Sequence, residues 1–101
     1  MQTLPISIPS DALSEFCRKY RVRRLSLFGS VLRDDFRPDS DVDILVDFGP
    51  DVRIGLIGFA GMEIELSALL GRKVDLNTPE FLSPYFIDEV LREAAPIYVA
   101  P

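Results

Sequence analysis

The stretch GSVLRDDFRPDSDVDILVDF, residues 29–48, decides the fold of this chain. It opens with a Gly-Ser turn at Gly29, which closes an apolar run over residues 22–28. A polar loop then leads to the sequence Ser-Asp-Val-Asp at residues 40–43, which opens a second apolar run. The pattern predicts a strand, a glycine turn, a loop and a second strand in that order.

The residues from Asp41 to Phe48 alternate as the residues of a β-strand do. Successive side chains of a strand point to opposite faces, so one face is predicted to be apolar and the other acidic. The apolar face is formed by Val42, Ile44, Val46 and Phe48, and the opposite face by Asp41, Asp43, Leu45 and Asp47. We expect the apolar face to pack against the core.

Asp41 and Asp43 are predicted to point the same way, about 7 Å apart by strand geometry. Two ionised carboxylates at that separation repel each other by roughly 1–2 kcal/mol at an effective dielectric constant of about 20. A divalent cation turns this repulsion into attraction, and Mg²⁺ prefers hard oxygen ligands completed by phosphate oxygens. The turn at Gly29 and Ser30 is the expected place for that phosphate, with Arg33 placed to neutralise it. The combination indicates metal-assisted chemistry on a nucleoside triphosphate.

A third carboxylate is expected on another strand, over residues 73–77. Val74 and Leu76 share one face of this strand, and Asp75 lies between them on the other face. If the strand neighbours residues 41–48, Asp75 joins the acidic face and completes a site of the two-metal type. A buried aspartate without a partner would be costly there, so a metal or another partner is expected.

The remaining elements alternate between helices and strands, which favours an α/β (α+β) fold in which a sheet is covered by helices. The whole chain, residues 1–101, is expected to be one domain. The other predicted elements are a helix from Ser10 or Asp11 to Tyr20, a strand over 22–28, a short helix over 31–36, a helix over 52–70 closed by Gly71, a helix begun by Ser83 and Pro84 and ending near Ala94, and a short strand over 97–99.

Composition excludes several classes of function. The net charge of −5 and the isoelectric point near 4.6 argue against direct binding to nucleic acid. The chain has no histidine, so acid–base chemistry must use carboxylates, tyrosine or lysine. No stretch is long enough to cross a membrane, and the single cysteine, Cys17, fits a reducing compartment. We therefore expect a cytoplasmic protein.

Each of these features also has an ordinary structural interpretation. A Gly-Ser pair is usually a simple turn, and two aspartates one residue apart often form a solvated strand face. Asp75 alone would suit an edge strand, and Arg33 alone would suit an ion pair with Asp34 or Asp35. The prediction of chemistry therefore rests on the joint arrangement of the glycine turn, the Ser-Asp-Val-Asp sequence and the third aspartate.

That arrangement resembles the nucleotidyltransferases of the DNA-polymerase-β superfamily, and more narrowly the minimal nucleotidyltransferases (the MNT group) that serve as antitoxins of HEPN-domain toxins. The pattern is carried by Gly29, Ser30, Arg33, Ser40, Asp41 and Asp43. The later stretch LLGRKVDLNTPEFLSPYFIDEVLREA, residues 69–94, resembles the family segment that supplies the third acid, here Asp75. The resemblance runs from about Ser10 to Val99 and implies a palm-like mixed sheet.

The resemblance implies a nucleotidyltransferase that transfers AMP from ATP to a hydroxyl of its HEPN toxin, with release of pyrophosphate. The toxin is a ribonuclease, and the expected acceptor is a tyrosine. It assigns Mg²⁺ binding to Asp41, Asp43 and Asp75, deprotonation of the acceptor to Asp75, and nucleotide binding to Gly29, Ser30, Arg33 and Ser40.

Two alternatives stay open at this point. One is an antitoxin that neutralises its toxin by contact alone, for which exposed apolar residues of the last helix, such as Phe86 and Val90, are candidates. The other is a transferase that modifies a small molecule, which at this length would need a partner subunit to build the acceptor pocket.

Overall fold

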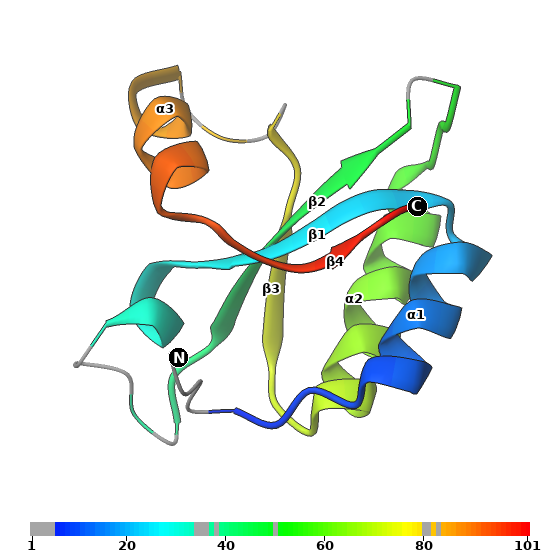
Figure 1. The fold of residues 1–101 in the computed structure, drawn as a ribbon, viewed down its shortest axis with the longest axis horizontal. Coiled ribbons are helices and arrows are strands. Elements are labelled where there is room, and N and C mark those ends of the chain that lie inside the picture. Colours follow the sequence, from blue (N-terminus) through cyan, green and yellow to red (C-terminus); the bar gives the residue numbers. More distant parts are fainter. Residues whose placement is uncertain (1–5, 34–36, 38, 50, 80–81, 83) are drawn as a thin grey trace.

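A computed structural model describes residues 6–33, 37, 39–49, 51–79, 82 and 84–101, and in this part of the chain four strands form one mixed sheet flanked by helices (Figure 1). The strands are β1 (Val22–Phe28), β2 (Val42–Phe48), β3 (Val74–Asn77) and β4 (Ala95–Val99), and they lie side by side in the order β3-β2-β1-β4. The predicted fold class is confirmed.

The directions of the strands follow from their connections. β1 is antiparallel to both β2 and β4, whereas β2 and β3 are parallel. A parallel pair needs a long crossover, which is normally a helix. Here helix α2 (Leu56–Leu70) provides that crossover between β2 and β3.

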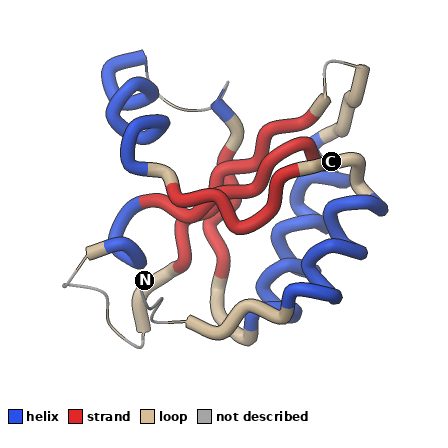
Figure 2. The backbone as a smooth tube through the Cα atoms, viewed as in Figure 1, coloured by secondary structure: helices blue, strands red, loops and turns tan. Residues whose placement is uncertain are grey.

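The helices divide between the two faces of the sheet, as Figures 1 and 2 show. Helix α1 (Ser10–Lys19) and helix α2 cover one face, and helix α3 (Pro84–Glu93) lies on the other side. The core forms between the sheet and the α1–α2 layer. Its fully buried side chains include Leu13, Cys17, Leu25, Leu27, Val31, Val42, Ile44, Val46, Met62, Leu66 and Val74.

Strand β2 shows the predicted alternation on its apolar face. Val42, Ile44 and Val46 are fully buried against the helical layer, while Asp43 on the other face is only half-buried. Leu45 is also buried, although it shares the face of Asp43. The acidic face is therefore covered over part of its length.

Helix α2 begins later than predicted. The spacing of apolar residues indicated a helix from Val52, but the observed helix starts at Leu56, with Gly55 in an extended conformation before it. The backbone N–H of Val52 donates a hydrogen bond to the carbonyl of Gly49, so the chain first makes a turn after β2. The helix ends as predicted, at Gly71, whose φ of +67° suits a glycine.

Two other elements differ modestly from the prediction. The chain after β1 forms a short 3-10 helix, η1 (Gly29–Leu32), which begins two residues earlier than the helix expected over 31–36; residues 34–36 lie outside the described part. Strand β4 begins at Ala95 rather than at residue 97. Ser83, the predicted N-cap of α3, also lies outside the described residues. Among the residues described, no helix is both long and apolar enough to cross a membrane.

Candidate active site

Asp43 and Asp75 lie directly opposite each other on neighbouring strands. They are register partners in the parallel β2–β3 pair, flanked by the register pair Val42–Val74 and the pair Ile44–Leu76. These flanking side chains are buried in the core, so both aspartates face the opposite side of the sheet. The prediction that residues 74–77 neighbour β2 and place Asp75 on the acidic face is confirmed.

Gly29 lies against Asp43 at the point where β1 ends. Phe28, the last residue of β1, is the register partner of Asp43, so the following turn begins beside this carboxylate. Gly29 has a φ of +75°, which residues with a side chain rarely adopt. A β-carbon at this position would also overlap the Asp43 carboxylate. The glycine is therefore required both by its backbone conformation and by the close approach of Asp43.

The Asp43 carboxyl group sits in an unfavourable environment for a negative charge. Burial, which is the largest cause, acts together with the neighbouring carboxylates of Asp75 and Asp41 to raise the pKa of Asp43 from 3.8 to about 6. The positive charge of Arg33 opposes this effect. A strongly perturbed carboxyl group with like-charged neighbours is typical of a functional site.

Asp41 was predicted as the first residue of this strand, but it lies immediately before the observed β2, which begins at Val42. Its carboxylate is exposed, and its Oδ2 atom lies 3.9 Å from Nζ of Lys73. The backbone N–H of Val42 donates a 2.9 Å hydrogen bond to the carbonyl of Lys73, which fixes the start of β2 beside β3. Within the described ranges, no three acidic or cysteine side chains are already arranged to hold a metal ion.

Ser40 stabilises the turn that precedes Asp41. Its Oγ atom accepts a 3.0 Å hydrogen bond from the backbone N–H of Arg37, and its own N–H donates to the Arg37 carbonyl. The guanidinium group of Arg72 then donates hydrogen bonds to the carbonyls of Arg37 (2.9 Å) and Ser40 (3.0 Å). Sequence reasoning selected Ser40 but gave no role to Arg72, although Arg72 lies in the stretch 69–94 that carries the family resemblance.

Arg33 follows η1 and points toward α3. Its Nη2 atom lies 3.6 Å from Oε2 of Glu93, at the end of α3. The partners considered from the sequence, Asp34 and Asp35, lie outside the described residues. Both members of the Arg33–Glu93 pair are about half exposed, so the pair contributes little to stability. Arg33 thus stands at the site, close enough to lower the pKa of Asp43.

Two side chains of α2 hold strand β3 in place. β3 is an edge strand, and its outward N–H groups need partners. The Glu63 carboxylate accepts a 2.8 Å hydrogen bond from the N–H of Leu76, and Ser67 Oγ accepts a 3.0 Å bond from the N–H of Val74. Sequence reasoning noted Glu63 only as a polar exception in an apolar helix. The structure shows that it fixes the strand that carries Asp75.

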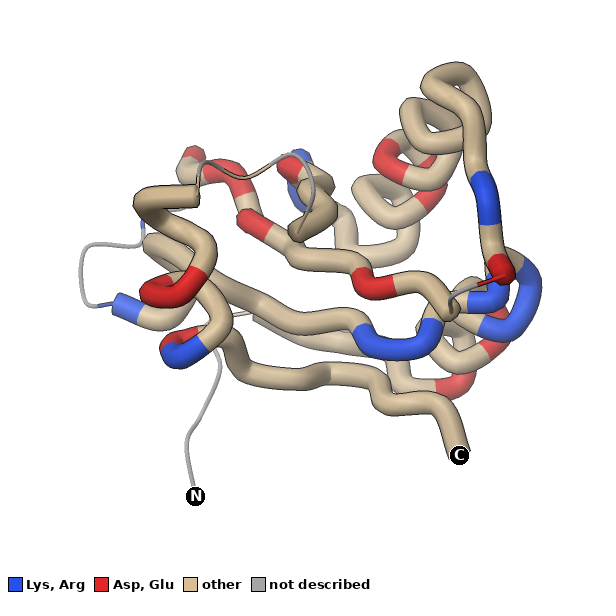
Figure 3. Tube along the Cα trace, turned by 90° about the horizontal axis from the view of Figure 1, so that it is seen from above, with Lys and Arg blue, Asp and Glu red and all other residues tan. Residues whose placement is uncertain are grey.

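The basic residues of β1 lie at the opposite end of the β1–β2 pair from Asp41 and Asp43, beside Asp47, which is the register partner of Arg24. Figure 3 shows the charged positions along the trace. Basic residues gather at the start of β1, where Val22 pairs with Phe48 at the end of β2. The acidic residues Asp41 and Asp43 stand at the start of β2, beside the end of β1. The arginines of the sheet therefore do not neutralise the acidic site, which is left able to attract a cation.

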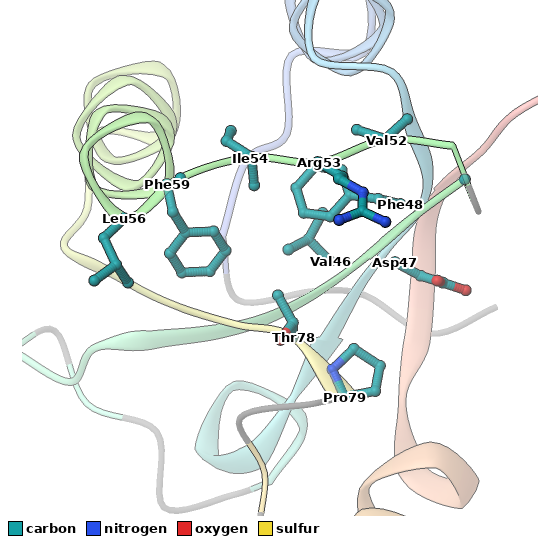
Figure 4. A pocket seen from close by; sticks show the side chains of 12 residues that line it. Val46, Asp47, Phe48, Val52, Arg53, Ile54, Leu56, Phe59, Thr78 and Pro79 are labelled. Atoms are coloured by element: carbon teal, nitrogen blue, oxygen red, sulfur yellow. The ribbon is translucent and has the colours of Figure 1, made fainter.

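A cavity of about 680 Å³ lies elsewhere, beyond the other end of β2 (Figure 4). Its lining is mainly apolar and includes Phe48 and Phe59, together with Arg53 and Thr78. Within the described part of the chain, Thr78 Oγ1 is the buried side-chain oxygen that lacks a hydrogen-bond partner. The lining does not include Asp43 or Asp75, so this cavity is separate from the pair of aspartates.

Known proteins are similar to this chain over most of its length. The family model for a nucleotidyltransferase domain matches residues 10–97. The protein adenylyltransferase MntA of Thermococcus cleftensis is 41% identical over 93 residues, which cover 92% of this chain and 90% of that protein. A candidate protein adenylyltransferase of Methanocaldococcus jannaschii is 37% identical over 79 residues, covering 78% of this chain and 83% of that protein.

Solved structures share the fold. A candidate minimal nucleotidyltransferase has a TM-score of 0.71 and 36% identity, over 87% of this chain and 88% of that one. A chain of a toxin–antitoxin crystal structure with AMP-PNP has a TM-score of 0.73 and 19% identity, over 92% of this chain and 75% of that one. A chain in the structure of a tri-AMPylated Shewanella oneidensis HEPN toxin in complex with MNT antitoxin has a TM-score of 0.65 and 18% identity, over 90% of this chain and 70% of that one.

Proposed function

Since this chain belongs to the nucleotidyltransferase domain family, we propose that it is a protein adenylyltransferase that acts as the antitoxin of a HEPN toxin. Its relatives are named as protein adenylyltransferases, and proteins of the same fold occur in toxin–antitoxin complexes. The observation that carries the proposal is the pairing of Asp43 with Asp75 beside the Gly29 turn. This arrangement places carboxylates next to a backbone turn that a triphosphate can approach.

The carboxylates suit a divalent metal ion such as Mg²⁺. Asp41, Asp43 and Asp75 offer only hard oxygen donors, and a cation would favour the ionised form of Asp43, whose pKa is raised by burial first and by the nearby carboxylates second. We propose that these three residues hold the metal. When bound, Mg²⁺ would stabilise the negative charge that develops on the phosphates during transfer.

The proposed nucleotide contacts come from the residues around η1. The backbone of Gly29 and the hydroxyl of Ser30 would hold the triphosphate, because no side chain at Gly29 blocks its approach. Arg33 would exchange its ion pair with Glu93 for a phosphate oxygen. Ser40 would contribute indirectly, because its Oγ atom stabilises the turn that positions Asp41.

The proposed reaction transfers AMP from ATP to a hydroxyl of the toxin, and tyrosine is the expected acceptor. A bond forms between the acceptor oxygen and the α-phosphorus, and the bond from that phosphorus to the bridging oxygen of the β-phosphate breaks. Pyrophosphate leaves with the electrons of the broken bond. Asp75, exposed on the edge strand β3, would take the proton of the hydroxyl.

Intact-mass measurement of the HEPN protein encoded beside this chain tests the proposal. That protein would be incubated with this chain, ATP and Mg²⁺, and in parallel with Asp41→Ala/Asp43→Ala. Asp51→Ala, an exposed aspartate in the turn after β2, is the matched control. We expect whole AMP units on the toxin with the wild type and the control, and none with the double variant.

The outcomes separate catalysis from simple contact. Peptide mapping of the modified toxin would identify the acceptor, and omission of Mg²⁺ would test the metal. An unmodified toxin that still forms a complex and is still neutralised would overturn the transferase proposal in favour of a contact-only antitoxin. Transfer that survives in Asp41→Ala/Asp43→Ala would overturn the assignment of these carboxylates.

A further inference from the structure

Helix α3 carries large apolar side chains that the core does not use. None of its described side chains is buried. Tyr85 is 92% exposed, Phe86 60% and Leu91 53%. Exposure of more than half of each of three large apolar side chains on a ten-residue helix is unfavourable in water and is typical of a surface that meets a partner.

This helix lies on the same side of the sheet as the catalytic aspartates. Leu91 lines a small hollow of about 70 Å³ together with Leu45 and Asp47, which share the strand face of Asp43. At the end of the helix, Glu93 pairs with Arg33 next to η1. A protein that covers α3 would therefore stand at the edge of the site.

A second exposed apolar surface, on α2, lies on the opposite side of the sheet from the proposed site. Helix α2 exposes Ile57 (92%) and Ile64 (71%) on the face turned away from the sheet. α2 and the sheet itself separate that surface from Asp43 and Asp75, which face the opposite side (Figure 1). A hydroxyl presented from a protein bound on α2 would not reach the carboxylates.

The charges around α3 define the chemistry of its partner. The helix exposes Asp88, Glu89 and Glu93, against one basic residue, Arg92. Asp41 and Asp75 on the same side of the molecule are also exposed. Complementarity therefore favours a partner surface that has an apolar centre and a basic rim.

We propose that α3 is the docking surface for the acceptor protein, through Phe86, Leu91 and the neighbouring Tyr85. The partner is a protein with an apolar patch bordered by lysine and arginine, close to the hydroxyl that receives AMP. This inference rests on the proposed function, because it identifies the docked protein with the protein substrate. Docking orients the hydroxyl toward the Asp43–Asp75 pair and converts the transfer into a reaction within the complex.

The test compares two double variants that exchange exposed apolar residues for serine on opposite sides of the molecule. Phe86→Ser/Leu91→Ser removes the α3 surface, and Ile57→Ser/Ile64→Ser is the matched control on α2. Binding to the HEPN protein encoded beside this chain is measured by calorimetry, without nucleotide. We expect the α3 variant to raise the Kd by about tenfold or more, and the α2 variant to leave it within about twofold.

Further measurements keep the result interpretable. Circular dichroism and ATP binding check that each variant is folded and holds nucleotide. A second variant, Asp88→Lys/Glu89→Lys, keeps the apolar residues and tests the charge; we expect slower association and a weaker dependence of the association rate on salt. Equal affinity of wild type and both α3 variants, or loss of binding only in the α2 variant, would overturn the inference.

The experiment also distinguishes this inference from the proposed function. Asp43→Asn alters the site but not α3, so it is expected to bind the toxin and transfer no AMP. If the wild type binds through α3 but never modifies the toxin, the docking surface stands and the transferase proposal fails. If the wild type modifies the toxin and the α3 variant does so equally well at limiting toxin concentration, the docking surface fails alone.

Discussion

The carboxylate of Asp43 occupies the space that a β-carbon at position 29 would need. Gly29 and Asp43 belong to different strand ends, joined by the antiparallel pairing of Phe28 with Asp43. The glycine therefore serves two purposes. It allows the backbone to turn with a φ of +75°, and it leaves the carboxylate room beside the proposed phosphate site.

Gly29→Ala is expected to damage both stability and transfer. The positive φ and the overlap with Asp43 would each force a rearrangement, for which we expect a loss of about 1–3 kcal/mol of unfolding free energy. Urea denaturation measures this loss, and toxin modification measures the rate, which should fall by about a hundredfold or more because the aspartate is displaced.

Gly61→Ala is the control for that experiment. Gly61 lies inside helix α2, and a β-carbon there would meet no atom within 4 Å. Alanine is the better helix former, so this variant should be more stable than the wild type by about 0.5–1 kcal/mol. Equal stability of the two alanine variants would show that position 29 is not under the constraint described.

Asp43→Asn is expected to stabilise the metal-free protein at neutral pH. The folded protein holds the Asp43 proton up to a pKa of about 6, whereas the unfolded chain releases it near 3.8. The folded state binds more protons between these values, so stability falls as the pH rises through this window and then levels off. Asparagine removes that fall.

The effect is measured by thermal unfolding in a chelator, from pH 4.5 to pH 8. At pH 7 the unfolding free energy of Asp43→Asn should exceed that of the wild type by at most about 1 kcal/mol, since the wild-type carboxylate is half exposed and solvent screens its charge. Excess Mg²⁺ should reverse the order, because a metal that binds the native carboxylates stabilises only the wild type. A difference in stability between Asp43→Asn and the wild type that does not change with pH would contradict the prediction.

Glu63→Ala is expected to loosen strand β3 and with it Asp75. The variant leaves the N–H of Leu76 without its carboxylate partner, at a cost of about 1–3 kcal/mol. Glu63→Gln retains an acceptor oxygen and should lose less. Hydrogen exchange at the Leu76 amide is the direct measurement, and unchanged protection in Glu63→Ala would contradict the assigned role.

Arg72→Lys is expected to lower transfer with little effect on folding. The planar guanidinium of Arg72 reaches two carbonyls of the turn before Asp41, and one ammonium group does not reproduce this geometry. We expect an unfolding free energy within about 1 kcal/mol of the wild type and a transfer rate lower by about tenfold. If Mg²⁺ binding is then unaffected, the turn does not position Asp41.

Most of the fold could be predicted from the sequence because the signals were local. The alternation of residues 42–48 predicted β2 and its two faces, and the spacing of Leu13, Phe16 and Cys17 suits the buried side of α1. The predicted start of α2 was wrong. The apolar residues at 52 and 54 fit helical spacing, but the chain first forms a turn at Gly49 and an extended segment at Gly55.

The sequence by itself determined which residues we propose for the chemistry. Gly29, Asp41, Asp43 and Asp75 stand out because their types and spacing in extended strands depend only on local backbone geometry. The tertiary structure decided how these residues meet. The parallel register places Asp75 opposite Asp43, the end of β1 brings Gly29 against that carboxylate, and the side chains of Glu63 and Arg72 hold the strand and turn from a distance in sequence. Such contacts join residues that are far apart along the chain, and they exist only once strand pairing and helix packing have been established.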